Sequence, residues 1–76
     1  MTAATVHLDL RGLACPLPVL KTRKALAGMP AGARLSVDTT DPLAKIDIPN
    51  LCRQDGHRLI EVTEEGGVFR LVIERG

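Results

Sequence analysis

The sequence predicts a two-layer α/β sandwich, of the α+β type, in which two helices cover one face of a four-stranded mixed sheet. Strand-like and helix-like apolar patterns follow each other along the 76 residues in the order βαβαββ. The chain has no repeats, linkers or low-complexity runs, and its length allows only one core. We therefore expect a single domain over residues 1–76.

The first half predicts a strand, a helix and a second strand. Residues 6–10 alternate weakly and residues 34–39 alternate clearly, which is typical of half-buried strands. Between them, residues 16–29 predict a helix whose end is marked by Gly28 and Pro30. The expected apolar arc of this helix consists of Val19, Leu20, Leu26 and Ala27.

The second half predicts a short helix and a hairpin. Asp41 can cap a turn that starts with Pro42, but Pro49 would interrupt a regular helix. We therefore expect the second helix over about residues 48–54. The two remaining strands, 57–64 and 68–74, would be joined by a turn at Gly66-Gly67.

The first predicted helix starts with the motif Cys15-Pro16-Leu17-Pro18. Proline lacks an N–H and has a helical φ, so Pro16 suits the first helical position and makes Cys15 the N-cap. Pro18 removes a donor that has no intrahelical partner. A helix N-terminus carries about half a positive charge, so we expect the pKa of Cys15 to lie below its usual value of about 8.5. The motif predicts an exposed nucleophile.

Residues near the motif are candidates for presenting the sulfur. Gly12 provides a glycine-containing approach to the helix, and Arg11 is the nearest cation in the sequence. The predicted partner-binding residues are Arg11, Leu17, Lys21, Arg23 and Lys24. The alternative is that the basic residues form an ordinary solvated helix face.

The remaining cysteine and the histidines are interpreted as structural residues. Cys52 is expected to be buried in the second helix, with a resolving thiol as the alternative role. His7 and His57 are isolated, and lone histidines most often serve as hydrogen-bonding groups. Because the two cysteines and two histidines of the chain include no close ligand pair, the sequence predicts no metal site.

Composition narrows the class of function. Ten basic and nine acidic residues give a net charge of +1, so we expect no direct nucleic-acid binding. The sequence has no secretory signal and no stretch that could span a bilayer, which favours a cytoplasmic protein without membrane contact. With Phe69 as the single aromatic residue, the core must be aliphatic, and an active group would sit on the surface.

The chain resembles the TusA family of small sulfur-carrier proteins, also called the SirA-like family, whose hallmark is a Cys-Pro-x-Pro motif at the first helix. The matching segments are Leu8-Asp9-Leu10-Arg11-Gly12-Leu13-Ala14-Cys15-Pro16-Leu17-Pro18-Val19-Leu20, Arg23-Lys24, Asp41-Pro42, Asp47-Ile48-Pro49, Cys52 and Gly56-His57-Arg58-Leu59. The resemblance implies the same fold. It also implies a cysteine desulfurase or a rhodanese-type protein as sulfur donor, and a DsrE-like or other protein as acceptor. The sulfur would serve tRNA thiolation, molybdenum cofactor maturation or sulfur oxidation.

The residues and the resemblance together predict a sulfur relay. The Cys15 thiolate would take sulfane sulfur from a donor persulfide and hold it as a covalent persulfide, without a separate cofactor. We expect a monomeric sulfurtransferase-type carrier rather than a stand-alone enzyme. Two alternatives remain open: a non-catalytic protein- or RNA-binding regulatory module with a structural Cys15, and a peroxide sensor that pairs Cys15 with Cys52.

Overall fold

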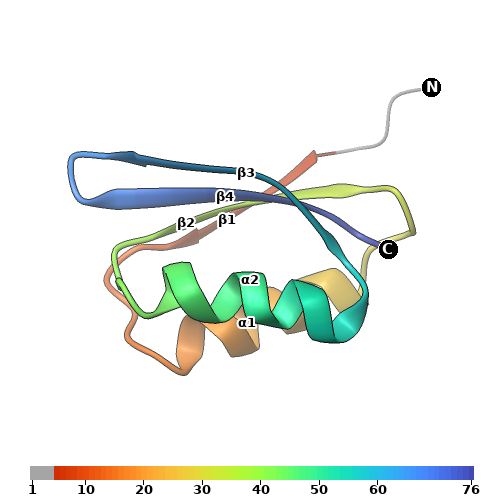
Figure 1. The fold of residues 1–76 in the computed structure, drawn as a ribbon, viewed down its shortest axis with the longest axis horizontal. Coiled ribbons are helices and arrows are strands. Elements are labelled where there is room, and N and C mark those ends of the chain that lie inside the picture. Colours follow the sequence, from red (N-terminus) through yellow and green to blue (C-terminus); the bar gives the residue numbers. More distant parts are fainter. Residues whose placement is uncertain (1–4) are drawn as a thin grey trace.

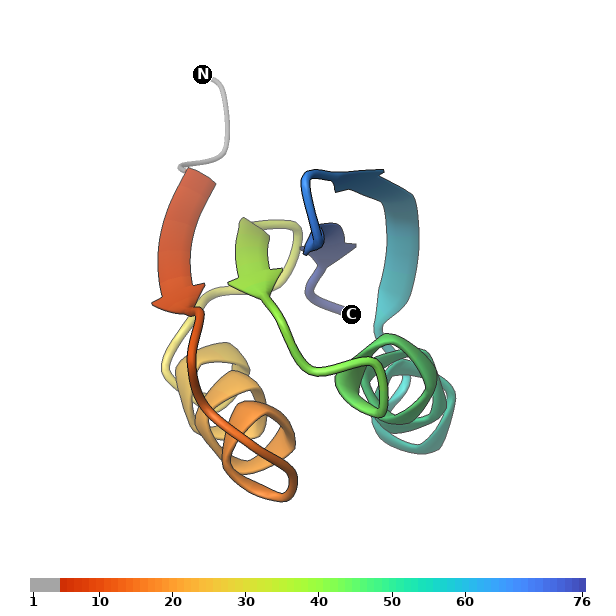
Figure 2. The same ribbon diagram turned by 90° about the vertical axis from the view of Figure 1, so that its left-hand side faces the viewer.

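The computed structural model describes residues 5–76 and confirms the predicted order of elements. These are β1 (Thr5–Leu10), α1 (Leu17–Ala27), β2 (Arg34–Thr39), α2 (Ala44–Asp55), β3 (Arg58–Glu65) and β4 (Val68–Glu74). The strands form a mixed sheet in the order β1-β2-β4-β3, and both helices lie on one face of it (Figure 1, Figure 2). The predicted fold class is therefore correct.

The pairing of β1 with β2 brings two loops to one end of the molecule. These strands are parallel, and Leu10 at the end of β1 pairs with Thr39 at the end of β2. The loop that leads into α1 and the loop that leads into α2 therefore start side by side (Figure 1). The other two pairings, β2 with β4 and β3 with β4, are antiparallel.

The hairpin forms where the sequence predicts it. Gly66 and Gly67 both have positive φ, at 57° and 79°, as a tight hairpin turn requires. The register of β3 against β4 shifts between Leu59 and Glu61, so the regular alternation expected for β3 is broken there.

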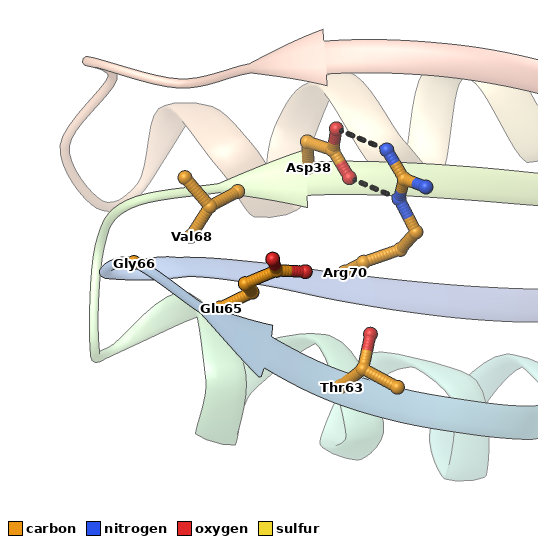
Figure 3. Close-up of a pocket in the computed structure, with 6 residues that line it drawn as sticks. All are labelled: Asp38, Thr63, Glu65, Gly66, Val68 and Arg70. Carbon is orange, nitrogen blue, oxygen red and sulfur yellow. Dashed lines mark hydrogen bonds and ion pairs between the residues drawn. The ribbon is translucent and has the colours of Figure 1, made fainter.

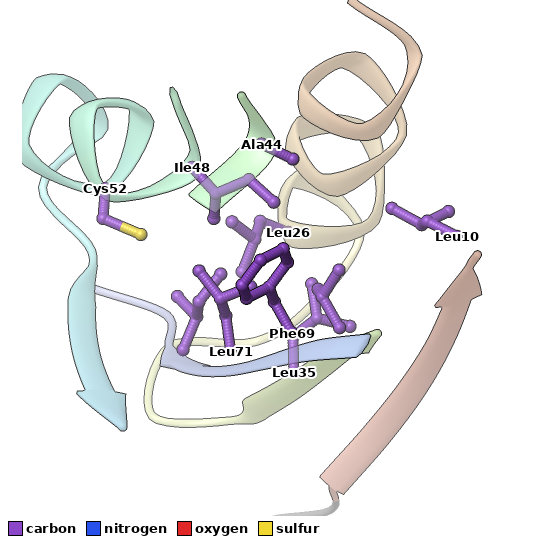
Figure 4. Packing of buried hydrophobic residues seen from close by; sticks show 10 residues of the cluster. Leu10, Leu26, Leu35, Ala44, Ile48, Cys52, Phe69 and Leu71 are labelled. Carbon is purple, nitrogen blue, oxygen red and sulfur yellow. The ribbon is translucent and has the colours of Figure 1, made fainter. Parts of the chain in front are cut away.

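The core lies between the sheet and the two helices (Figure 4). The inward residues of the two central strands are buried as the alternation predicts, with Leu35 and Leu71 fully inaccessible to solvent. The buried cluster comprises Leu10, Leu26, Leu35, Val37, Ala44, Ile48, Cys52, Phe69, Leu71 and Ile73. The core is therefore aliphatic around one aromatic ring.

The start of α1 differs from the prediction. The helix begins at Leu17 with Pro16 as its N-cap, so the assignment of Cys15 as N-cap is wrong. The reason is an additional turn, closed by a hydrogen bond of 3.0 Å from the Leu17 N–H to the Ala14 carbonyl. Pro18, at the second helical position, still fits because its missing N–H would have no partner in the first turn.

The buried face of α1 also differs from the predicted arc. The residues of α1 that are buried are Pro18, Thr22 and Leu26, which are spaced four apart. Leu20 is 52% exposed instead of packing inward. The buried face of α1 therefore contains Thr22, a small polar residue, and Leu20 lies on the surface.

The second helix is longer than predicted. It begins at Ala44 and continues through Pro49, so the expected start near residue 48 is wrong. A proline inside a helix costs about 3 kcal/mol. Full burial of an aliphatic side chain contributes about 1.5–3 kcal/mol, and both Ile48 and Leu51 of this helix are buried. Burial of these two side chains therefore outweighs the local cost of the proline.

Candidate functional site

Cys15 lies in the loop between β1 and α1, and its side chain is exposed. It lines a groove of about 310 Å³ between the two helices. The other residues that line this groove are Pro16, Val19, Arg23, Asp47, Asn50, Leu51 and Gln54. The sulfur is therefore open to a reactive group on another protein.

The Cys15 loop is held by the segment that follows β2. The Gly12 N–H donates to Thr40 Oγ1 at 2.9 Å, and the Cys15 N–H donates to Asp41 Oδ2 at 2.6 Å. Gly12 has a φ of +81°, a conformation that glycine adopts with little strain. The other carboxylate oxygen of Asp41 accepts the Leu43 N–H at 3.0 Å. Asp41 therefore caps the turn before α2, as the sequence predicts. One carboxylate thus fixes both loops.

The sulfur itself contacts a carboxylate. Cys15 Sγ donates a hydrogen bond to Asp47 Oδ2 at 3.3 Å. This hydrogen bond, partial desolvation and the nearby charges of Asp47 and Asp41 raise the pKa of the Cys15 thiol. The predicted lowering of this pKa is therefore wrong. The two carboxylates oppose the thiolate that the helix terminus was expected to favour.

The arginines near the motif are engaged by other carboxylates. Arg11 Nε and Nη2 each lie 2.9 Å from an oxygen of Asp9, and this pairing lowers the pKa of Asp9 to about 2. Arg23 lines the Cys15 groove, where its Nε lies 3.1 Å from Asp55 Oδ2. Neither arginine donates a hydrogen bond to the sulfur.

The predicted partner-binding residues of α1 are divided between two sides of the helix. Lys21 and Lys24 line a shallow hollow beside Leu8 of β1, whereas Arg23 lines the groove with Cys15. Leu17 is exposed at the first position of α1. The structure therefore separates the two lysines from the arginine instead of gathering them around the sulfur.

The other candidate residues lie away from the Cys15 groove or are buried. Cys52 is 2% exposed in the core, and burial raises the pKa of its thiol. The Nδ1 atom of His57 accepts the Gly76 N–H at 3.1 Å, a structural hydrogen bond near the end of the chain. Within residues 5–76, no three potential metal ligands gather as a metal site would require. In the same part of the chain, the helices are too short or too polar to cross a bilayer.

A second hollow, of about 430 Å³, lies on the sheet face that the helices leave uncovered (Figure 3). Its central feature is a two-pronged ion pair in which Arg70 Nε and Nη2 lie 2.7 and 2.9 Å from the oxygens of Asp38. His7 Nε2 is 3.5 Å from the same carboxylate. The negative charge of Asp38 is therefore compensated by the neighbouring Arg70 guanidinium.

Sequence reasoning missed the two carboxylates that face Cys15. Asp41 was interpreted only as a helix cap, and Asp47 was given no role beyond its place in the matching segments. The strand topology could have indicated this contact. If β1 and β2 are parallel neighbours, the loops that follow them start side by side at one end of the sheet. The contact of Asp47 with Cys15 also requires α2 to begin before Pro49. The sequence pattern predicts a later start, because a proline inside a helix is unfavourable.

Comparison with known proteins gives one consistent result. The family model described as "Sulfurtransferase TusA" matches residues 6–75. The sulfur carrier protein TusA of Allochromatium vinosum is 43% identical over 69 residues, which cover 91% of each chain. A candidate sulfur carrier of Neisseria meningitidis is 49% identical over 67 residues, which cover 88% of this chain and 90% of the relative. The crystal structure of a SirA-like protein from Desulfitobacterium hafniense superposes with a TM-score of 0.81 at 27% identity, covering 96% of this chain and 97% of the other.

Proposed function

The chain belongs to the TusA family of sulfur carriers, and we propose that Cys15 is the residue that holds the transferred sulfur, as a persulfide. The observation that carries this proposal is the placement of the sulfur. Cys15 is the exposed one of the two cysteines, and it lines a groove at the end of the molecule where two loops meet. Cys52, in contrast, is part of the core.

Sulfur uptake at this position is a nucleophilic exchange between two proteins. The Cys15 thiolate attacks the outer sulfur of a donor persulfide, and a new S–S bond forms on Cys15 Sγ. The S–S bond of the donor breaks, and its electron pair stays on the donor cysteine sulfur. That thiolate takes up one proton, equivalent to the proton released from Cys15. The exchange has no net oxidation and requires no separate cofactor.

Release repeats the same chemistry in the other direction. A thiolate of the acceptor protein attacks the outer sulfur of the Cys15 persulfide, and Cys15 leaves as a thiolate. We propose a cysteine desulfurase or rhodanese-type protein as donor and a DsrE-like or other protein as acceptor. The relay would operate in the cytoplasm with a monomeric carrier, without nucleic acid bound to it. The pathway it would serve is tRNA thiolation, molybdenum cofactor maturation or sulfur oxidation.

Exposed apolar side chains near this end of the molecule support docking of partner proteins. Leu17 stands at the start of α1, and Leu43 and Ile46 stand at the start of α2. Exposed large apolar residues that lie close together mark interaction surfaces more often than isolated ones do. We propose that partners contact these residues, with Lys21 and Lys24 at the side of α1 affecting the association rate.

Sulfur loading tests the proposal directly. The protein is incubated with cysteine, pyridoxal phosphate and a cysteine desulfurase, and its intact mass is measured. We expect the parent protein and the matched Cys52→Ala variant to gain one sulfur atom, and Cys15→Ser to gain none. Equal loading of Cys15→Ser would contradict the proposal, and no loading of any variant would favour a binding module.

A further inference from the structure

We propose that Asp47 is a positioning residue that holds the Cys15 thiol in its protonated form while the carrier is free. The proposal rests on the assignment of Cys15 as the sulfur-carrying residue. It adds a control on that residue: the same side chain that orients the sulfur also delays its reaction until the charge of the carboxylate is offset. Asp47 acts through Cys15 and makes no bond to the transferred sulfur.

The geometry of the contact determines which form of the sulfur it favours. Cys15 Sγ and Asp47 Oδ2 are 3.3 Å apart. An ionised carboxylate only accepts hydrogen bonds, so this contact is favourable only if the sulfur carries a proton to donate. A thiolate at the same distance would face a like charge, which disfavours ionisation. The contact therefore stabilises the thiol and not the reactive thiolate.

The surrounding charges do not reverse this preference. The charged residues on the two helices and on the loops before them are Arg11, Lys21, Arg23, Lys24, Asp41, Lys45, Asp47, Arg53 and Asp55. Lys21 and Lys24 line the hollow on the other side of α1, and Arg53 donates a hydrogen bond to Asn50 Oδ1. Arg11 and Arg23 are each bound to a carboxylate, at 2.9 and 3.1 Å. The Nζ atom of Lys45 lies 5.2 Å from the centre of the Phe69 ring. Asp41 bonds the backbone of Cys15 and adds a second negative charge.

This arrangement makes reactivity conditional on a partner. Sulfur uptake and disulfide exchange both use the thiolate, so a neutral thiol reacts slowly with electrophiles in solution. A docking protein that places a lysine or arginine beside Asp47 would remove the repulsion and raise the thiolate fraction. The free carrier would be protected from unspecific reaction by the same contact.

The test is the pH profile of Cys15 alkylation in the Asp47→Asn variant. Asparagine has nearly the same shape as aspartate and keeps an acceptor oxygen, but it carries no charge. The second-order rate with iodoacetamide is measured from about pH 6 to about pH 11, a range that brackets thiol ionisation, in a Cys52→Ala background. Glu61→Gln, which removes one charge from β3, is the matched control.

We expect Asp47→Asn to move the inflection of the profile to lower pH. The rate at neutral pH should rise roughly two- to fivefold, the size of an interaction between exposed charges. The alkaline plateau should stay constant or fall slightly, because a thiolate of lower pKa is less nucleophilic. Glu61→Gln should follow the parent curve.

Two results would overturn the proposal. One is an unchanged inflection in Asp47→Asn, and the other is an equal rise at neutral pH and on the plateau, which indicates that Asp47 merely shields the sulfur.

The parent protein provides an independent check if Asp47→Asn fails to fold. A cationic methanethiosulfonate should label Cys15 faster than an anionic one, and salt should reduce the difference. Equal rates, or faster anionic labelling, would also overturn it. Because no sulfur donor is used, these outcomes are separate from the loading test.

Discussion

Two acidic regions of the molecule differ in what their carboxylates contact. On the uncovered sheet face, Asp38 is held by Arg70 through two ion-paired hydrogen bonds. At the helical end, Asp41 accepts backbone N–H groups and Asp47 accepts a thiol. The first region lowers the pKa of its acid, whereas the second raises the pKa of the cysteine.

The difference shows that the size of a hollow does not identify the reactive site. The hollow at Asp38 has a volume of about 430 Å³, against about 310 Å³ for the groove at Cys15. The charge of Asp38 in the larger hollow is compensated there by Arg70. The smaller groove contains an exposed thiol and a carboxylate that opposes its ionisation. A group whose ionisation is opposed by its surroundings is a better marker of function than volume.

The largest effect is expected from Asp41→Ala. The variant loses two bonds to backbone N–H groups, so the free energy of unfolding should fall by about 1–2 kcal/mol. It also loses a negative charge near the sulfur, so alkylation of Cys15 at neutral pH should become faster. Urea unfolding and alkylation rates measure the two effects. Asp41→Asn should recover part of the stability but not the parental rate, and equal instability of both variants would contradict this account.

A smaller effect is expected from Arg70→Met. Methionine keeps much of the aliphatic stem but leaves the mostly buried Asp38 carboxylate without its partner, so the protein should unfold at lower urea concentration. The exposed Arg58 of β3, changed to methionine, is the control. Alkylation of Cys15 should not change in either variant. If Arg70→Met altered the alkylation profile, the two regions would be coupled.

The smallest effect is a difference in the pH range over which each region affects stability. The pKa of Asp38 lies below its ordinary value of 3.8, so its contribution is present above that value and is lost as the pH falls through the folded pKa. The pKa of Cys15 lies above its ordinary value, so its contribution is lost as the pH rises through the folded pKa.

Melting temperatures across the pH range test this contrast. Asp38→Asn should flatten the acid side of the stability curve, and Cys15→Ser should flatten the alkaline side. The second comparison uses a Cys52→Ala background, because the buried thiol also has a raised pKa. If both variants changed the same side of the curve of melting temperature against pH, the proposed difference between the two regions would be contradicted.

Much of the fold could be predicted from local patterns. The bounds of β2 and β4 agree with the expected segments 34–39 and 68–74, because alternation and turn glycines define strands locally. The extent of α2 could not be predicted in this way. Its passage through Pro49 depends on burial of Ile48 in the core and of Leu51 beside the groove between the helices, which is a tertiary contribution.

The exposure of Cys15 could be predicted from the sequence, but the charges around its sulfur could not. The double-proline motif predicts an exposed Cys15, and the structure places this residue exposed in a groove. Proximity in sequence made Arg11 the expected neighbour of the sulfur, but Arg11 binds Asp9 two residues away. The true neighbour, Asp47, is 32 residues distant and reaches the sulfur only through the parallel pairing of strands and the longer α2.

The anchoring of the Cys15 loop has a consequence for protein engineering. The Gly12 N–H donates to Thr40 and the Cys15 N–H donates to Asp41. The position of the Cys15 loop is therefore fixed by the segment before α2. The outward side chains of α1 can therefore be exchanged as a set while the reactive atom stays in place. The side chains available for such an exchange are Leu17, Leu20, Lys21 and Lys24. We expect such an exchange to change the α1 part of the proposed docking surface without moving the sulfur.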